Sequence, residues 1–437
     1  MFKKLFRNSF IADVFSLSTG RIVIAAIGFL VSIFLARVLG PTQQGIVTTL
    51  LVAPAIVLSF ADLGMRQAAT FFLGKQIFND QTVLSTILFM SIITSLMSAG
   101  IVAIVYWITG YSEQYALFTL WIPILSIPFR LLSNLGTGIL MAKQRIREIA
   151  ISNILMDLVY FLLLIPLVLI NSYKVEYSLF AYFLSSVVVM FYIIRIVKNY
   201  GNLRPAYIQG VPWKFIKLGF VYGIALFVLG LHYRVDVMLL ERLSSATEVG
   251  YYGIGVGVAE KIWLLPAALV TVNFARSAAA SDHLAYARKT AKLLRLSLWV
   301  SVIPCMLLYF LSPRVIPLVY GDAYQRSGLI VQAILPGIWA ALVFKILNSD
   351  LAGRGRPDAA MWVYGFALIL NIWLNITWIP PYGAMGSAWA TSVSYGVGAI
   401  IFGIVYARMS HLNIRELIIP QKHDFDLILL KIQKDTK

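Results

Sequence analysis

The dominant pattern along the chain is a series of apolar stretches separated by short polar connections. A transmembrane helix needs about 20 mostly apolar residues to cross the hydrocarbon core of a bilayer. Windows of that kind recur along the sequence and predict twelve transmembrane helices. The predicted helices are 16–39, 46–68, 83–108, 116–142, 149–170, 177–198, 214–240, 249–273, 291–312, 328–350, 359–380 and 384–408.

The composition agrees with this pattern. Of the 437 residues, 60% are hydrophobic and only 13% are charged, whereas about 25% of residues are charged in an ordinary soluble protein. The connections are too short for a sizeable soluble catalytic domain, so we expect an all-α polytopic membrane protein rather than an enzyme. The single Cys305 and four scattered histidines predict no metal site, and nothing in the sequence indicates a cofactor.

The basic residues are distributed unevenly between the two sides of the predicted helices. With the N-terminus inside, 26 Lys and Arg fall on the inner side and 5 on the outer side. Cytoplasmic connections carry this excess in multi-pass proteins. We therefore predict a bacterial inner-membrane protein with both termini cytoplasmic. The net charge of +17 is accordingly a topology signal, and we expect no nucleic-acid partner.

Two pairs of segments repeat at similar spacing. Arg37–Gly45 matches Arg242–Gly250 at an offset of 205, and Leu140–Arg145 matches Leu351–Arg356 at an offset of 211. Both pairs lie at equivalent helix ends, which predicts a repeat of six plus six helices. Because six is even, the two halves start on the same side of the membrane and the repeat is parallel.

The predicted architecture is therefore two six-helix bundles related by a parallel pseudo-two-fold around a central cationic cavity. Such an arrangement is typical of transporters that work by alternating access. The predicted parts are an N-terminal bundle at 1–198, a cytoplasmic linker at 199–213, a C-terminal bundle at 214–409 and a cytoplasmic tail at 410–437.

Five basic residues lie well inside predicted helices, away from the helix ends. A charge at the bilayer centre costs about 2.5–3.5 kcal/mol on insertion scales, so such a residue faces a partner or a water-filled cavity. Arg130 and Lys261 lie midway along their helices and are the best candidates for substrate binding in the cavity. Arg234, Lys345 and Arg21 are further candidates, for which snorkelling to a headgroup or a structural ion pair is the alternative.

Acidic residues in the helices are candidates for ion coupling or gating. Asp62 and Arg66 are four residues apart, which also allows a local structural pair. Asp157 has no charge one turn away and is a candidate proton or cation carrier. Asp236 and Glu260 are candidates for contacts that close one face of the cavity.

An inward cationic set favours an anionic substrate, and guanidinium groups bind pyrophosphate oxygens bidentately. The chain lacks a P-loop ATP-binding motif, so it is not an ATP-driven pump in its own right.

Several short motifs, in order, resemble the bacterial polysaccharide-transporter family, which includes the O-antigen (Wzx-type) flippases of the multidrug/oligosaccharidyl-lipid/polysaccharide exporter superfamily. The resemblance covers residues 10–410. Its motifs are Arg37–Gly45, Phe60–Gly64, Asp236, Val249–Tyr252, Glu260–Pro266 and Ile379–Thr391. The resemblance implies translocation of an undecaprenyl-pyrophosphate-linked oligosaccharide to the periplasmic leaflet, coupled to an ion gradient. Expected partners are this lipid-linked glycan, membrane lipids, and the polysaccharide polymerase and chain-length proteins.

Three alternatives stay open at this point. A drug or metabolite exporter of the same superfamily would favour an acidic, aromatic-lined cavity. A lipid II or teichoic-acid flippase would share the cationic lumen. A membrane-embedded enzyme of glycan assembly would depend on one or two carboxylates rather than on several basic residues.

Overall fold

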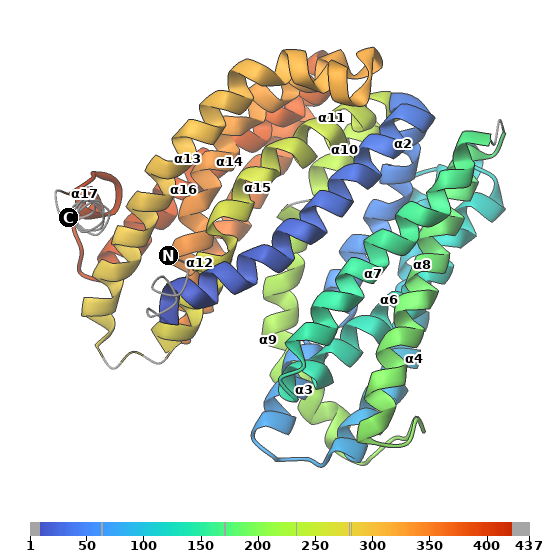
Figure 1. The fold of residues 1–437 in the computed structure, drawn as a ribbon, viewed down its shortest axis with the longest axis vertical. Coiled ribbons are helices and arrows are strands. Elements are labelled where there is room, and N and C mark those ends of the chain that lie inside the picture. The colour runs from blue at the N-terminus through green and yellow to red at the C-terminus, as the bar shows by residue number, and fades with distance from the viewer. Residues whose placement is uncertain are drawn as a thin grey trace, which may run out of the picture. The chain divides into compact units, whose positions relative to one another are not determined.

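The computed structural model describes residues 9–62, 64–169, 172–232, 234–278, 280 and 282–421, and Figure 1 shows their arrangement in helices. Within these residues, every regular element is helical. Nine helical segments of the described chain are long and apolar enough to cross a membrane, and one of them, Val23–Gly74, contains the predicted window 46–68 and most of 16–39. The all-α, multi-pass class predicted from the sequence is confirmed.

The chain divides into two compact units. The N-terminal unit is Val23–Gly253 with Val319–Ala323, and the remaining residues form the C-terminal unit. The bundle limits derived from the sequence, 1–198 and 214–409, are a different division and stay a prediction.

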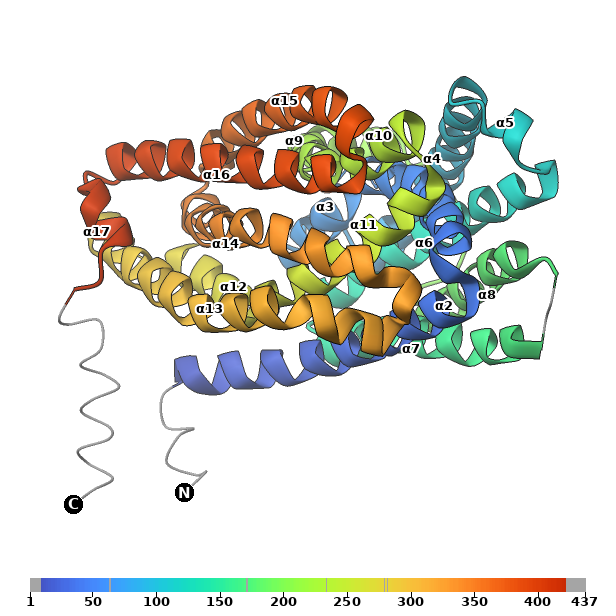
Figure 2. The same ribbon diagram turned by 90° about the horizontal axis from the view of Figure 1, so that it is seen from above.

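The helices of the N-terminal unit are, in chain order, α2 (Ser9–Ala61, from Val23 onward), α3 (Met65–Gly74), α4 (Asp80–Ile108), α5 (Tyr111–Gln114), α6 (Leu117–Ala142), α7 (Ile146–Leu164), the 3-10 turn Ile165–Leu169, α8 (Lys174–Val197), the 3-10 turn Lys198–Tyr200, α9 (Val211–His232) and α10 (Val235–Leu243). The helix α11 (Ala246–Ala259) continues into the C-terminal unit. There it is followed by the 3-10 turn Glu260–Trp263, α12 (Leu264–Ala278), α13 (His283–Tyr320), the 3-10 turn Asp322–Tyr324, α14 (Gln325–Gly353), α15 (Pro357–Tyr382), α16 (Ala384–Met409) and α17 (Ile414–Ile418). Figure 2 shows α13, α14 and α16 running side by side, with α17 at one end of them.

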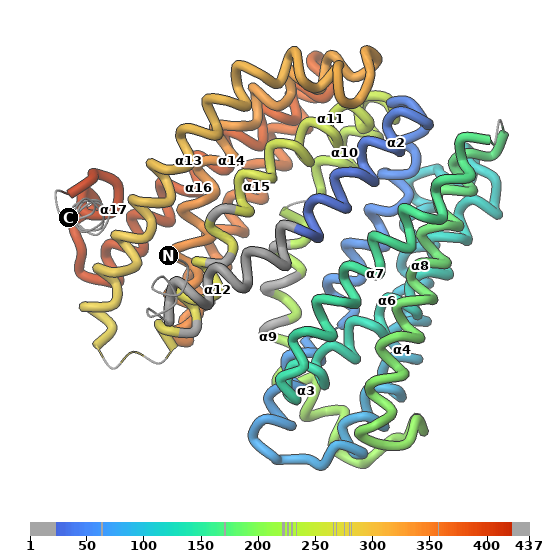
Figure 3. The backbone as a smooth tube through the Cα atoms, in the orientation of Figure 1, coloured from blue at the N-terminus to red at the C-terminus, as the bar shows by residue number. Residues whose placement is uncertain are grey.

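The first apolar segment is interrupted at two glycines. Gly40 has a φ of 71°, and α2 turns back there, as the blue part of the trace in Figure 3 shows. At the end of α2, the carboxylate of Asp62 accepts a hydrogen bond of 2.6 Å from the backbone N–H of Gly64. A Cβ on Gly64 would lie 2.1 Å from the carbonyl oxygen of Gly219 in α9. The Phe60–Gly64 motif thus ends α2, begins α3 and permits close packing of α9.

The first repeated pair of segments makes a reciprocal contact within the N-terminal unit. The hydroxyls of Thr42 and Thr247, which are 205 residues apart, are 2.8 Å from each other. A Cβ on Gly45 would lie 1.7 Å from the carbonyl oxygen of Ala246, and a Cβ on Gly250 would lie 2.0 Å from that of Pro41. In an isologous contact, residue i contacts j of the partner while j contacts i. These two segments pack on each other in that way, about a local two-fold axis.

The second repeated pair shares a backbone conformation. Gln144 and Gly355, at the fourth and tenth predicted helix ends, have φ angles of 57° and 76°. In both Leu140–Arg145 and Leu351–Arg356, the N–H of the last residue donates to the carbonyl of the first at 2.8 Å. The two helices therefore end in the same left-handed C-terminal motif, in which this bond satisfies an otherwise unpaired carbonyl.

Apolar side chains lie both inside and outside the units. Met65, Leu135 and Phe215 are fully buried in one hydrophobic cluster of the N-terminal unit. On the outer surfaces, Trp107 and Trp362 are 73% and 75% exposed. Large exposed apolar side chains are expected where helices face lipid instead of water.

Candidate functional site

The N-terminal unit contains a cavity of about 270 Å³ between α2, α6, α7 and α8. Its lining is mostly polar, although the surrounding helices are apolar. The polar side chains that line it are Ser59, Arg130, Ser133, Asn134, Thr137, Ser152, Asn153 and Ser186. One guanidinium, two amide side chains and five hydroxyls thus line a single space. Such a lining can bind an anion and hydrogen-bond to hydroxyl groups.

Arg130 is half-buried in this cavity, two residues after Pro128 of α6. Its guanidinium carbon lies 5.1 Å from the centroid of the Tyr182 ring, and one Nη lies 3.8 Å from the sulfur of Met156. Neither neighbour carries a negative charge, and no carboxylate of the described residues forms a salt bridge with Arg130. The guanidinium therefore retains its capacity to bind an anion bidentately.

Asp62 and Arg66 lie at one end of the same region and are joined through α6. The amide of Asn134 donates to the carboxylate of Asp62 at 3.2 Å, and its oxygen accepts from Arg66 at 3.2 Å. Gly138, one turn further along α6, approaches so closely that a Cβ there would lie 2.7 Å from the carbonyl oxygen of Arg66. Asn134 is thus the link between the charged pair and the cavity, a role that the sequence alone does not assign.

Three other predicted residues of the N-terminal unit lie elsewhere. Asp157 is half-buried on α7, and its carboxylate lies 3.8 Å from where a Cβ of Gly28 would be. Asp236 is buried and accepts hydrogen bonds from the Tyr252 hydroxyl and the Val237 N–H. Arg234 is exposed at the start of α10. Their coupling, gating and binding roles stay predictions.

The C-terminal unit brings two of its predicted residues, Lys345 and Glu260, near each other and leaves Lys261 apart. The ammonium group of Lys345 lies 3.9 Å from the centroid of the Trp263 ring, and Glu260 is close enough to act on it electrostatically. Lys261, by contrast, is exposed on the 3-10 turn between α11 and α12. The side chain of Arg21 lies outside the described residues. A cavity role for these three cations stays a prediction.

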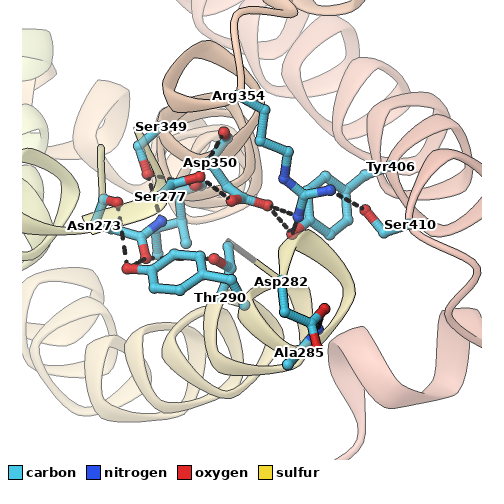
Figure 4. A network of polar contacts seen from close by, with 12 residues as sticks. Asn273, Ser277, Asp282, Ala285, Thr290, Ser349, Asp350, Arg354, Tyr406 and Ser410 are labelled. Atoms are coloured by element: carbon cyan, nitrogen blue, oxygen red, sulfur yellow. Dashed lines mark hydrogen bonds and ion pairs between the residues drawn. The ribbon is translucent and has the colours of Figure 1, made fainter. Parts of the chain in front are cut away.

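A buried charged cluster at one end of α14 was not expected from the sequence. Asp350 is fully buried and forms an ion pair with Arg354, and its carboxylate also accepts hydrogen bonds from Tyr406 and Ser277 (Figure 4). Asp350 is the last residue of the predicted helix 328–350, so the sequence does not indicate a charge inside the membrane there. The spacing of Asp350 and Arg354, four residues apart, was the available signal.

One known protein family matches more than half of the chain. The family described as "Polysaccharide biosynthesis protein" matches residues 10–277. The chain belongs to this family.

Relatives within and around the polysaccharide biosynthesis family are distant in sequence. The probable low-salt glycan biosynthesis flippase Agl15 of Haloferax volcanii is 23% identical over 411 residues, which cover 90% of this chain and 80% of that protein. The putative O-antigen transporter of Shigella flexneri is 24% identical over 177 residues, covering 40% and 42% of the two chains. The probable multidrug resistance protein NorM of Thermotoga maritima is 21% identical over 215 residues, covering 45% and 46%. The last two matches span less than half of each relative's length.

Solved structures share the fold. The lipid II flippase MurJ in an inward closed conformation aligns with a TM-score of 0.75 at 16% identity, covering 97% of this chain and 93% of that one. An inward-facing multidrug transporter of the MATE family aligns with a TM-score of 0.69 at 13% identity, covering 90% and 94%. The chain therefore has the multi-helix fold of these membrane transporters.

Proposed function

We propose that the protein is a flippase that moves a lipid-linked oligosaccharide across the bacterial inner membrane, and that Arg130 binds the anionic headgroup. Family membership and the relatives named for glycan transport support this class of function. The observation that carries the residue assignment is the Arg130 guanidinium, which faces a polar cavity with no carboxylate of the described residues bound to it. We propose an undecaprenyl-pyrophosphate-linked repeat unit as the substrate, because a guanidinium can bind pyrophosphate oxygens bidentately.

The dimensions of the cavity support a headgroup rather than a whole glycan. Pockets for drug-sized ligands measure about 300–1,000 Å³. A cavity of about 270 Å³ therefore suits a smaller group, such as a phosphate and part of a sugar. Arg130 would hold the pyrophosphate oxygens. The hydroxyl and amide groups of Ser133 and Asn153 would bond the adjoining sugar.

Movement of the bound headgroup would follow alternating access, driven by an ion gradient. Asp62 and Arg66 are suitable coupling residues, because Asn134 connects both of them to the cavity that contains Arg130. Protonation of Asp62, or binding of a cation to it, would change how Asn134 is held. We propose that this change alters the affinity of the cavity for the headgroup.

The test is glycan display in a flippase-deleted host complemented with variants of this chain. We expect Arg130→Glu to abolish display and to accumulate lipid-linked repeat units, while protein levels in the membrane stay normal. Arg130→Lys should retain part of the activity, since an ammonium keeps the charge but loses the bidentate geometry. Arg147→Glu is the matched control, because this arginine is exposed in the first turn of α7.

Other outcomes separate the residue assignment from the function. Normal display with Arg130→Glu would show that this cavity does not bind the headgroup. Loss of display with Lys261→Glu as well as Arg130→Glu would extend the cationic path to the C-terminal unit.

A drug exporter is the second candidate, favoured by the likeness to the multidrug resistance protein NorM. It predicts that the unmodified chain fails to restore glycan display in its native host and instead raises resistance to cationic dyes. Accumulation of lipid-linked repeat units in the deletion strain would contradict the exporter function.

A further inference from the structure

The C-terminal unit has a second cavity of different character from the polar one. A pocket of about 360 Å³ lies between α13, α14 and α16, and residues of α17 also line it. Leu298 of α13, Val343 of α14, Ile400 of α16 and Leu417 of α17 are among its lining residues. All four elements present apolar side chains to it, so the pocket suits a hydrocarbon chain.

The polar atoms near this pocket are already hydrogen-bonded to backbone. The indole N–H of Trp339 donates to the carbonyl of Leu298 at 2.9 Å. The indole N–H of Trp299 donates to the carbonyl of Ile418 at 3.3 Å. Because both indole N–H groups are bonded, the surface that remains for a ligand is the apolar faces of the rings. Contact of such a surface with an apolar ligand is more favourable than contact with water.

Glycine opens one wall of the pocket. Gly396 and Gly403 of α16 both line it, and a Cβ on either residue would meet no atom within 4 Å. Larger side chains would therefore fit without clashing and would fill the space. The neighbouring surface is apolar and exposed, with Ile303 of α13 at 66% and Ile400 at 65%, so the pocket is part of a lipid-facing surface.

The helices that line this pocket carry several basic residues near α17. Arg288, Lys292 and Arg295 follow one another at four- and three-residue spacing on one side of α13. Arg295 is buried, and its guanidinium donates to the backbone carbonyl of Glu416 in α17. Arg408, at the end of α16, is exposed. 

Arg415 on α17 is also exposed. The one carboxylate on α17, Glu416, caps the N–H of Asn413 at 3.3 Å. The rim of the pocket is therefore predominantly positive and complements a phosphate group. Basic pockets between transmembrane helices bind anionic lipid headgroups in this manner.

The depth of the pocket selects among lipids. Its wall on α16 runs from Gly396 to Gly403, which at 1.5 Å per residue is about 10 Å. One leaflet of a bilayer is about 15 Å deep, half of the 30 Å hydrocarbon core. A pocket of this depth with a cationic rim matches one acyl chain and its headgroup, whereas a polyprenyl chain is far longer than the pocket.

We propose that this pocket binds an acyl chain of an anionic phospholipid whose phosphate is held by Arg288, Arg408 and Arg415. The site is separate from the Arg130 cavity and does not depend on which glycan is transported. It lies on the side of the membrane where the sequence places the excess of basic residues, so the ligand comes from the cytoplasmic leaflet.

The test is native mass spectrometry of the full-length protein in detergent, with phosphatidylglycerol or cardiolipin as probe and phosphatidylcholine as the zwitterionic control. We expect retention of an anionic lipid and little retention of phosphatidylcholine. Gly403→Leu should weaken retention about tenfold, because the new side chain occupies the space of a few methylenes. Gly365→Leu is the matched control, since a Cβ there also meets nothing within 4 Å but lies on α15, away from the pocket.

The rim is tested by charge. Arg408→Gln and Arg415→Gln should each reduce the preference for the anionic lipid about fivefold, the factor expected for one cation near a charged surface. Gly396→Leu serves as a second pocket variant should Gly403→Leu fail to fold, which thermal unfolding would reveal.

Three results would overturn the proposal. The first is equal retention of phosphatidylglycerol and phosphatidylcholine. The second is unchanged retention in a folded pocket variant. The third is displacement of the phospholipid by undecaprenyl pyrophosphate, which would assign the pocket to the transported lipid instead. Glycan display is measured separately, so failure of this proposal can be distinguished from failure of the flippase proposal.

Discussion

Two helix ends of this protein have the same design but different energetics. In the N-terminal unit, Lys143 lies over the ring of Tyr200 at 5.3 Å and forms an ion pair of 2.7 Å with Asp80 at the start of α4. In the C-terminal unit, Arg354 lies over the ring of Tyr406 at 5.8 Å and pairs with Asp350 of its own helix. The two cations are 211 residues apart, at the spacing of the sequence repeat.

The difference between the two ends is burial. The side chains of Lys143 and Asp80 are 30% and 33% exposed, whereas those of Arg354 and Asp350 are 10% and 0% exposed. Exposed ion pairs contribute little because water and salt screen them. Removing one partner of a buried pair leaves an uncompensated charge and is strongly destabilising. The comparison teaches that a repeat can keep a cation, a tyrosine and a turn while only one copy depends on them for stability.

The largest effect is expected from removing the buried carboxylate. Asp350→Asn should lower the free energy of unfolding by about 3–5 kcal/mol, because the Arg354 charge stays buried without a counter-charge. The measurement is thermal unfolding in detergent with a thiol-reactive dye, which reports exposure of the single Cys305. Asp80→Asn is the matched control and should cost at most about 1 kcal/mol. Equal losses in the two variants would contradict the role of burial.

Tyr406→Phe should be the next largest, with a loss of about 1.5–3 kcal/mol, the range for a hydrogen bond to a charged group. The Tyr406 hydroxyl donates to the buried Asp350 carboxylate. Tyr200→Phe removes a hydroxyl that accepts from the exposed Arg145 at 3.3 Å, so we expect little change in the same assay. A similar loss at both positions would contradict the special role of the hydrogen bond to the buried carboxylate.

The two turns give a reciprocal pair of smaller effects. Gly355→Gln places a side chain at a φ of 76° and should cost about 1–2 kcal/mol, because left-handed backbone is unfavourable for residues with a Cβ. The measurement is again the unfolding temperature. A neutral result would mean that this turn relaxes at no cost.

Gln144→Gly should have the smallest effect, with a gain of about 1 kcal/mol or less. Glycine relieves the strain at a φ of 57° but makes the unfolded chain more flexible, and the two contributions partly cancel. Chemical denaturation of the detergent-solubilised protein is suited to a change of this size. A loss of stability would show that the Gln144 side chain makes a contact that outweighs the backbone strain.

Part of the candidate site could be predicted from the sequence. The sequence indicates Arg130 as a cavity residue because a charge in the middle of a helix requires polar surroundings. In the structure, Arg130 lines the polar cavity. The same argument selected Lys261, but the helix there is replaced by a 3-10 turn and the side chain is exposed. Hydropathy windows treat a segment as a continuous helix, so they do not register such an interruption. Asn134 was not assigned a role because an amide serves helix packing and ligand binding equally well.

The sequence by itself determined the all-α, multi-pass class and the spacing of the two repeated pairs of segments. These properties depend on the length of the apolar segments and on residue spacing along the chain. A segment that crosses a bilayer must be apolar, long enough and helical, so these features can be read from the sequence. Only the tertiary structure decided that Asn134 joins Asp62 to Arg66, that Thr42 meets Thr247, and that Asp350 is the most buried charge of its cluster. Those facts depend on which faces of separate helices meet, and many residues distant in sequence set the helix rotations that bring the faces together.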